Sequence, residues 1–412
     1  MTLSPDELVA AIHATPTRLV LAITGGGSRA ISTLLEAPGA SRTVMEAVVP
    51  YSDGSLVRWL GGPPDQACSP PTARAMAMAA FCRARDYCPP DNQAVGRTGN
   101  SSGNEADLVD GLPIRPTGRP TPIPSPLLAG IAATASLASD RPKRGPHRVQ
   151  LAAQTAAATV SWSLELAKGH RSRAEEEQLV TRLVLNLAAD VCGLPSRLEL
   201  GLLPEEHLES RTTPAPPDWQ ELLEGVRTLV RHGGQPNPAD RASDLVFPGA
   251  FHPLHAGHRR MAQVAEAMVG RRADFEISIR NVDKPPLDYT EIQQRLAQFS
   301  PGETVWLTRA PTFEEKSQEF PGATFLVGAD TIRRIADPRY YSGETAMHQA
   351  LERIVGRGCR FLVFGRLGPS GFVRLGDLEL PPALRRISVE VSAEQFREDI
   401  ASSELRRDHR FE

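Results

Sequence analysis

The stretch Leu245-Val-Phe-Pro-Gly-Ala-Phe-His-Pro-Leu-His-Ala-Gly-His258 joins a short apolar run to a turn that contains histidines three residues apart. An apolar run bounded by Pro and Gly predicts a buried strand. Beyond the turn, apolar residues recur with the i, i+3, i+4, i+7 period of a helix, at Met261, Val264, Ala265 and Met268. His255 and His258 therefore lie where a strand gives way to a helix, whose first N–H groups are unpaired and whose dipole is positive. The sequence predicts a phosphate site at this turn.

Strand and helix patterns alternate through the rest of this half of the chain. Apolar strand patterns occur at 275–279, 304–308, 324–327, 360–364 and 387–391, with helical periods between them. Such alternation predicts a parallel sheet with helices on both faces, which binds ligands at the carboxyl ends of its strands. The C-terminal half is therefore expected to be a Rossmann-like α/β domain.

The N-terminal half also carries mixed patterns. Ser4, Pro5 and Glu7 form a capping box with Pro at the first helical position. Strand patterns at 19–23, 130–136 and 147–151 and helical patterns at 72–85 and 171–191 follow. We therefore expect an α/β chain of two α/β domains.

The expected domain boundaries follow from composition. The first domain covers residues 1–200, with a polar Pro/Gly/Ser/Asn-rich insertion at about 88–126 that predicts disorder. Residues 201–240 form a linker with one short amphipathic helix between Trp219 and Val230. The second domain covers residues 241–412.

Composition narrows the class of protein. A chain of 412 residues predicts two domains, and a net charge of −3 argues against nucleic acid or a membrane surface as partner. The chain has no apolar run of membrane-spanning length, and its start lacks a basic leader, so we expect a cytoplasmic protein. Five cysteines without a CxxC pair favour reduced thiols over disulfides or zinc.

Four motifs of the C-terminal half resemble those of a known family. Gly249-x-Phe-x-Pro-x-His255-x-Gly-His258 is similar to the signature of the HxGH nucleotidyltransferases. Gly328-Ala-Asp330, the segment Ile400-Ala-Ser-Ser-Glu-Leu-Arg406 and Asn281-Val-Asp-Lys284 resemble segments of the nicotinamide/nicotinate mononucleotide adenylyltransferases in particular.

The resemblance implies transfer of AMP from ATP to a phosphorylated small-molecule acceptor, with release of pyrophosphate. His255, His258 and Arg406 would act on the ATP phosphates. Mg²⁺ would bridge phosphate oxygens mostly through water, and no protein side chain is expected to ligate it. The residues implied in nucleotide binding are Gly249, Phe251, Gly257, Lys284, Gly328, Asp330, Ser402 and Ser403.

Simpler interpretations accompany these roles. The two histidines could be a metal pair or a surface accident, and Asp330 could cap a helix that starts at Thr331. Ser402, Ser403 and Arg406 could merely begin a terminal helix. Other charged side chains of this half, Lys284, Arg295 and Lys316, could be solvated, and for Lys316 we expect the surface.

One departure from the family pattern affects the acceptor. His252 stands where the family usually has Asp, Asn or Thr. This keeps open other acceptors, such as phosphopantetheine, a flavin nucleotide or a phospho-alcohol with CTP. A nucleotide sensor that binds without turnover is a further alternative. The sequence also leaves open whether copies of the chain associate into a homo-oligomer.

The N-terminal half resembles the C-terminal domain of the competence/damage-inducible protein CinA, the nicotinamide mononucleotide deamidases. The resemblance rests on Thr24-Gly-Gly26, Pro38-Gly-Ala-Ser41 and Tyr51-Ser52. It implies a nucleophilic serine and an activating lysine, but Ala22 and Leu56 stand at those positions. We therefore expect a deamidase fold without deamidase activity.

The same half offers one further ligand hypothesis. The turn Gly25-Gly-Gly27 with Arg141, Lys143 and Arg144 could retain nucleotide binding. Alternatively, the glycines only make a turn and the basic run is a solvated loop.

Overall fold

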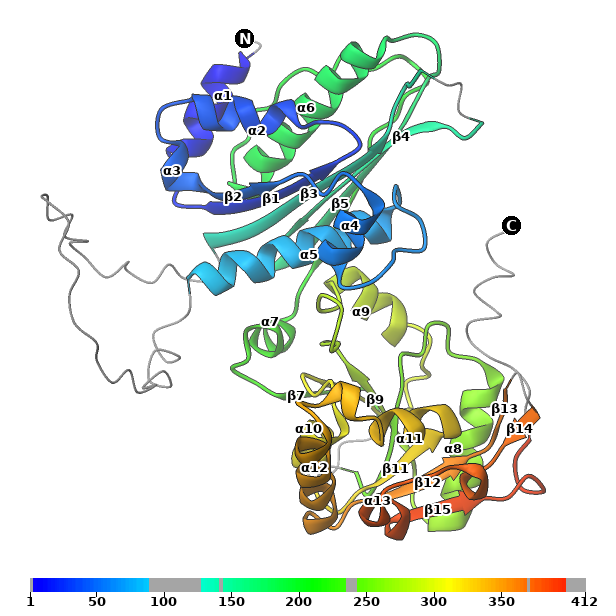
Figure 1. The fold of residues 1–412 in the computed structure, drawn as a ribbon. Helices are drawn as coiled ribbons and strands as arrows, with labels where there is room; N and C mark the ends of the chain where they lie inside the picture. The colour runs from blue at the N-terminus through cyan, green and yellow to red at the C-terminus, as the bar shows by residue number, and fades with distance from the viewer. Residues whose placement is uncertain (1–2, 89–126, 141–143, 235–242, 369–370, 398–412) are drawn as a thin grey trace, which may run out of the picture. The chain divides into compact units, whose positions relative to one another are not determined.

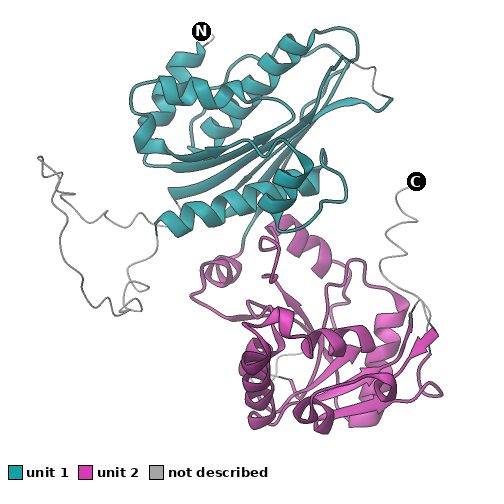
Figure 2. Cartoon of the chain, viewed as in Figure 1, with its two compact units in different colours: residues 1–215 teal, residues 216–412 magenta. Residues whose placement is uncertain are grey.

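The computed structural model describes residues 3–88, 127–140, 144–234, 243–368 and 371–397. The chain divides into two compact units, Met1–Ala215 and Pro216–Glu412 (Figure 2). Both units combine helices with a sheet, which confirms the predicted α/β class. Within the described residues, no helix is both long and apolar enough to cross a membrane.

The first unit is built on a six-stranded sheet in the order β2-β1-β3-β4-β5-β6 (Figure 1). The pairs β1–β2 and β1–β3 are parallel, and the remaining pairs are antiparallel. The strands are β1 (Arg18–Thr24), β2 (Val44–Val48), β3 (Leu128–Ser136), β4 (His147–Gln154), β5 (Ala158–Leu166) and β6 (Glu209–Pro214). The helices are α1 (Pro5–His13), α2 (Arg29–Glu36), α3 (Ala40–Thr43), α4 (Asp53–Leu60), α5 (Pro70–Tyr87) and α6 (Arg173–Val191).

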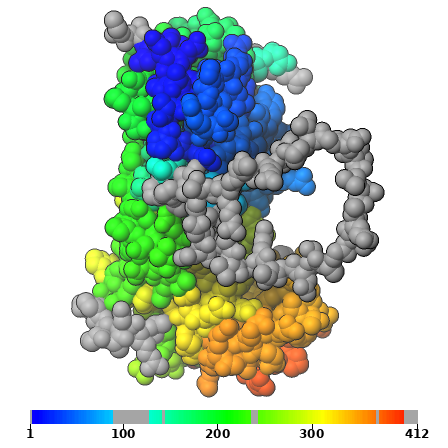
Figure 3. Space-filling view, turned by 90° about the vertical axis from the view of Figure 1, so that its left-hand side faces the viewer, coloured from blue at the N-terminus to red at the C-terminus, as the bar shows by residue number. Residues whose placement is uncertain are grey.

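Helices cover both faces of this sheet, α1, α2 and α6 on one and α4 and α5 on the other (Figure 1). Because successive side chains of a strand point to opposite faces, β1 contributes to two cores. Leu21 and Ile23 pack with α1 and α6, whereas Ala22 packs with α4 and α5. In the space-filling view the N-terminal segments, in blue, lie side by side on the surface of this unit (Figure 3).

The second unit has a seven-stranded sheet in the order β15-β12-β11-β8-β9-β10-β7. Its strands are β7 (Leu229–His232), β8 (Leu245–Pro248), β9 (Asp274–Ser278), β10 (Val305–Thr308), β11 (Thr324–Gly328), β12 (Arg360–Phe364) and β15 (Ser388–Val391). A short hairpin adds β13 (Arg366–Gly368) and β14 (Gly371–Val373). Its helices are α7 (Pro217–Glu224), α8 (Ala256–Val269), α9 (Tyr289–Leu296), α10 (Phe313–Glu319), α11 (Ala329–Ile335), α12 (Glu344–Gly356) and α13 (Pro382–Arg386), with 3-10 turns η3 (Pro338–Tyr340) and η4 (Leu375–Asp377).

All pairs of this sheet are parallel except β7 with β10. Taken in chain order from β8, the parallel strands follow the doubly wound order 3-2-1-4-5-6. The chain moves outward from β8 to β9 and β10, and then returns to β11 on the other side of β8. Ligands of such sheets bind at the carboxyl edge where the direction of winding reverses, which here is between β8 and β11.

The segment predicted as a linker differs from the prediction. Residues 209–214 form β6 on the edge of the first sheet, and Leu229 and Val230 belong to β7 on the edge of the second. The amphipathic helix ends earlier, at Glu224, because Gly225 adopts a left-handed conformation (φ 85°) at its C-cap. Edge strands pair on one side only and need little apolar patterning, so the composition did not reveal them.

Candidate functional site

Three turns of the second unit meet where its winding reverses. The motif with the two histidines leaves the carboxyl end of β8 and enters α8. Gly328 ends β11 and Asp330 lies in the first turn of α11. Beyond the end of β12, Arg366 begins β13. The sheet topology therefore brings together two of the motifs identified in the sequence and an arginine that sequence analysis did not select.

The turn after β8 is held by a packed aromatic residue. Phe251 is 1% exposed and adopts a positive φ of 44°. Its ring packs edge-on against Phe247 and His258, at centroid distances of 5.3 and 5.1 Å. A Cβ atom on Gly249 would approach that ring to 2.5 Å, so a glycine is needed there. The roles of Gly249 and Phe251 in this structure are thus to shape the turn.

The two motif histidines stack on each other. Their ring centroids are 3.7 Å apart, and the backbone N–H of His255 donates to Nδ1 of His258 at 3.2 Å. Burial, together with the charges of His255 and Arg366, lowers the pKa of His258 to about 3. The ring is therefore neutral at pH 7, and because Nδ1 accepts a hydrogen bond, the proton lies on Nε2. His258 offers an N–H donor whose state does not change near neutrality, while Gly257 is buried beside it in the first turn of α8.

Asp330 does not cap the helix that follows it. The N-cap of α11 is Gly328, and the Asp330 carboxylate lies 2.7 Å from Nη1 of Arg366. A Cβ atom on Gly328 would lie 2.9 Å from Oδ1 of Asp330, so this glycine leaves room for the carboxylate. Arg366 in turn lies close enough for its charge to lower the pKa of His258. The Arg366 guanidinium thus connects the two motifs.

His252, the residue that departs from the family pattern, has an acidic partner. Its Nδ1 lies 3.1 Å from Oε1 of Glu291 on α9. Arg295, one turn further along α9, pairs with the same oxygen at 2.9 Å. Burial raises the pKa of Glu291, but the bond from His252 and the charge of Arg295 outweigh it and hold the pKa at about 2. Arg295 is largely buried rather than solvated, since only 13% of its side chain is exposed.

The remaining predicted positions are distributed differently. Lys284 is exposed in the loop that follows β9, at the same edge of the sheet. Ser402, Ser403 and Arg406 lie outside the described residues. Their proximity to the histidines stays a prediction.

Lys316 was expected on the surface, and this was wrong. Its ammonium lies 2.7 Å from both carboxylate oxygens of Glu276 and 2.8 Å from the carbonyl oxygen of Ala310. Thr308 also donates to Glu276, at 2.5 Å. Lys316 follows the capping box of α10 at a position that faces the sheet, where a lysine is accepted only because an acidic partner on β9 neutralises it.

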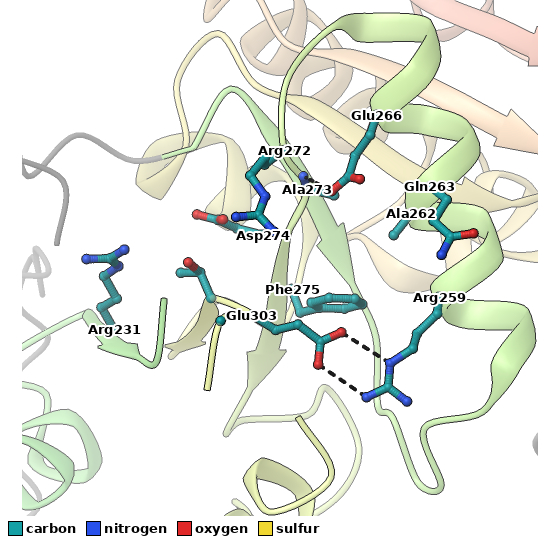
Figure 4. Close-up of a pocket in the computed structure, with 12 residues that line it drawn as sticks. Arg231, Arg259, Ala262, Gln263, Glu266, Arg272, Ala273, Asp274, Phe275 and Glu303 are labelled. Carbon is teal, nitrogen blue, oxygen red and sulfur yellow. Dashed lines mark hydrogen bonds and ion pairs between the residues drawn. The ribbon is translucent and has the colours of Figure 1, made fainter. Parts of the chain in front are cut away.

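A separate cavity of about 320 Å³ lies at the opposite, amino edge of the sheet (Figure 4). Its lining includes residues at the starts of β9 and β10 and one face of α8. Arg259 and Glu303 pair across it at 3.2 Å, and Ala273 N–H donates to Glu266 at 2.9 Å. Since most of its charges already have protein partners, we place the candidate site at the carboxyl edge.

In the first unit, the glycine-rich turn after β1 is occupied by protein groups. Gly25 and Gly27 have φ values of 75° and 87°. The Glu177 carboxylate accepts bonds from Gly27 N–H and from Ser28 Oγ, the latter at 3.3 Å. Burial raises the pKa of Glu177, but the bond from Gly27 N–H and the bond and charge of Arg173 lower it overall. A carboxylate already fills the position that a phosphate would need.

The basic run that accompanied this hypothesis is only partly described. Arg141 and Lys143 lie outside the described residues, and Arg144 is exposed. The structure therefore favours a purely structural role for the glycine turn.

Ala22 and Leu56, the positions at which the resemblance implies a nucleophile and a base, lie in one apolar cluster. Ala22 is 0% and Leu56 4% exposed, and both belong to the core between β1, α4 and α5. Met76 and Ala77 of α5 complete the contact. Nothing in this cluster can attack an amide carbonyl or accept its proton.

Comparisons with known proteins found structural matches only. The competence/damage inducible protein CihA from Agrobacterium tumefaciens matches with a TM-score of 0.30 and 17% identity, over 46% of this chain and 98% of that one. A competence-damaged protein (CinA) superfamily protein from Escherichia coli matches with a TM-score of 0.30 and 16% identity, over 46% of this chain and 88% of its own. No family model matches the chain, and no curated protein matches it.

Proposed function

We propose that the second unit is a nucleotidyltransferase that transfers AMP from ATP to a phosphorylated small molecule, with nicotinamide or nicotinate mononucleotide as the acceptor that the motifs favour. The observation that carries the proposal is the position of His258 and the Asp330–Arg366 pair at the reversal between β8 and β11. A helix N-terminus, a neutral N–H donor and a guanidinium at one edge suit an anionic ligand.

The chemistry requires little covalent work from the protein. An oxygen of the acceptor phosphate would attack the α-phosphorus of ATP, and the bond from that phosphorus to the bridging oxygen of the β-phosphate would break. Pyrophosphate leaves with that bonding pair. His258 Nε2–H and Arg366 would stabilise the charge that moves onto the phosphate oxygens.

Magnesium fits this proposal as a partner of the ATP phosphates. The described residues contain no group of three His, Cys, Asp or Glu side chains that could hold a metal ion. Mg²⁺ commonly keeps its waters and binds through substrate phosphates, which demands few protein ligands. Bound in this way, it would neutralise phosphate charge.

For the first unit we propose a deamidase-like fold that does not catalyse deamidation. The apolar surroundings of Ala22 and Leu56 support this proposal, and the occupation of the glycine turn by Glu177 argues against nucleotide binding there. The unit would then serve assembly or stability.

Pyrophosphate release tests the proposed activity. The full chain is incubated with Mg²⁺, ATP or CTP, and a panel of phosphorylated acceptors that includes both pyridine mononucleotides. We expect release with ATP and a pyridine mononucleotide, and loss of about 100-fold or more in His258→Ala. His348→Ala, which removes an exposed histidine of α12, is the matched control. Release only with other pairs would change the acceptor, and nucleotide binding without release would indicate a sensor.

A further inference from the structure

We propose that Gln298 is a positioning residue for the phosphate-binding turn, since its side-chain amide bridges the two ends of the segment that delivers His255 and His258. Gln298 follows the C-cap of α9 and lies outside every motif identified in the sequence. The inference deepens the proposed function and rests on it for the identity of the ligand.

The amide of Gln298 takes the place of a turn hydrogen bond. Its Nε2 donates to the carbonyl oxygen of Phe251 at 2.9 Å, and its Oε1 accepts from the N–H of Leu254 at 2.7 Å. These two backbone groups are three residues apart, and in a closed β-turn they would bond to each other. Here a side chain from another element satisfies both. The amide thereby fixes the width of the turn one residue before the N-cap of α8.

Gln298 is itself held by the helix that it positions. Arg259, the residue after His258, donates to the backbone oxygen of Gln298 at 3.0 Å. The same guanidinium is bound to Glu303 at 3.2 Å, as Figure 4 shows. Arg295, on α9, donates to Ala250 O at 2.9 Å. The turn before α8 and the first turn of α8 are thus tied to one short segment after α9.

Only an amide can make both bonds of Gln298. A carboxylate could accept from Leu254 N–H but would repel the Phe251 carbonyl oxygen, and an alkyl side chain would leave both groups unsatisfied. Phosphate transfer depends on donors held in place, and a displacement of about 1 Å can cost about 100-fold in rate. We therefore expect Gln298→Ala to lower kcat/KM for pyrophosphate release by about 10-fold to 100-fold, mostly through kcat.

The test compares Gln298→Ala and Gln298→Glu with Gln294→Ala. Gln294 is an exposed glutamine on α9, the helix that precedes Gln298, and provides a control of the same residue type. Circular dichroism and thermal unfolding establish that each variant is folded. Gln298→Glu keeps the acceptor and the shape of Gln298 but replaces the donor with an oxygen that repels the Phe251 carbonyl, so its activity should fall at least as far as that of Gln298→Ala.

A spectroscopic measurement separates failure of the inference from failure of the proposed function. In ¹⁵N-histidine NMR at pH 7, the wild-type His258 ring should be a neutral Nε2–H tautomer, because the His255 N–H donates to Nδ1. Loss of the Gln298 bridge should mix the tautomers, whereas Gln294→Ala should leave them unchanged. If no substrate pair is turned over, this signature still decides the inference. A folded Gln298→Ala with the wild-type tautomer and, where turnover exists, kcat within twofold of wild type would overturn it.

Discussion

The carboxylate of Asp330 lies 2.7 Å from the guanidinium of Arg366, and this contact joins the first turn of α11 to the segment that follows β12. The side chains of this pair are 55% and 44% exposed, so the attraction is screened by water and adds little to stability. Its position beside His258, rather than its strength, gives the pair its importance. Asp330 thus holds an arginine at the site where we propose that the phosphates of ATP bind.

Arg366→Met should therefore weaken nucleotide binding with little effect on folding. We expect the dissociation constant for Mg²⁺·ATP to rise by about tenfold, the cost of one charge-assisted bond. The free energy of unfolding should change by less than about 1 kcal/mol. Calorimetric titration and urea unfolding measure the two quantities.

The chain supplies a matched control for this variant. Arg339 forms an exposed pair with Asp337 at 2.6 Å in the same unit, and Arg339→Met should leave nucleotide binding unchanged. Equal weakening in both variants would show that general charge, and not the site, attracts the nucleotide.

The low pKa of His258 predicts how stability depends on pH. The folded value of about 3 lies below the ordinary value of 6.5, so between these pH values the unfolded chain binds one proton more at this residue. The contribution of His258 to the free energy of unfolding is fully present above pH 6.5 and is lost as the pH falls toward 3. The slope contributed is at most about 1.4 kcal/mol per pH unit. His258→Asn should flatten the dependence between pH 7 and 5 in urea unfolding, whereas a slope that matches wild type would contradict a buried neutral ring.

Breaking the buried pair of Lys316 and Glu276 should lower the free energy of unfolding strongly, in contrast to breaking the exposed pair of Asp330 and Arg366. Their side chains are 7% and 0% exposed, so Lys316→Met leaves a carboxylate in the core without its cation. We expect a loss of about 3 to 5 kcal/mol in the free energy of unfolding. Lys316→Met combined with Glu276→Gln should recover part of it, because the second change removes the stranded charge.

An exposed pair again provides the comparison for this prediction. Arg353, with 47% of its side chain exposed, pairs with Glu314, and Arg353→Met should cost less than about 1 kcal/mol. A loss in Lys316→Met as small as this would mean that water reaches Glu276 in the native state.

The contrast between Lys316 and Arg366 also shows what the sequence could predict. Local patterns were sufficient for the strand–turn–helix around His258 and for the α/β class, because both depend on periodicity and turn residues. Contacts between charged residues that lie far apart in the chain could not be predicted from such patterns. Lys316 is buried only because Glu276 lies on a neighbouring strand, and Arg366 reaches Asp330 only because β12 pairs with β11. Gln298 was missed for the same reason, since an isolated glutamine after a helix carries no pattern.

The order of the strands in the sheet could likewise not be predicted from the sequence. Alternation predicts parallel strands but not that β11 returns beside β8, and it is this return that brings Gly328 and Asp330 toward the histidines. Edge strands such as β6, with most of its residues exposed, lack the apolar alternation that would have marked them.

The apolar cluster around Ala22 and Leu56 yields a prediction for the first unit. A deamidase of the serine–lysine kind needs a hydroxyl and an unprotonated amine within reach of each other. Leu56→Lys would place an amine where the leucine is only 4% exposed, and burial would lower the pKa of that amine toward the neutral, basic form. The same burial makes the substitution costly, by about 3 kcal/mol, because packing is lost and a polar group is desolvated. Ala22→Ser would add a hydroxyl to a fully buried position of β1 and cost a further ~1–3 kcal/mol.

We therefore expect the wild type to release no ammonia from nicotinamide mononucleotide. The Ala22→Ser/Leu56→Lys double variant should lose stability in thermal unfolding before it gains activity. Ammonia release by the wild-type chain would show that a nucleophile outside this cluster acts in the first unit, and Ser28, whose hydroxyl bonds to Glu177, would then be the residue to replace next.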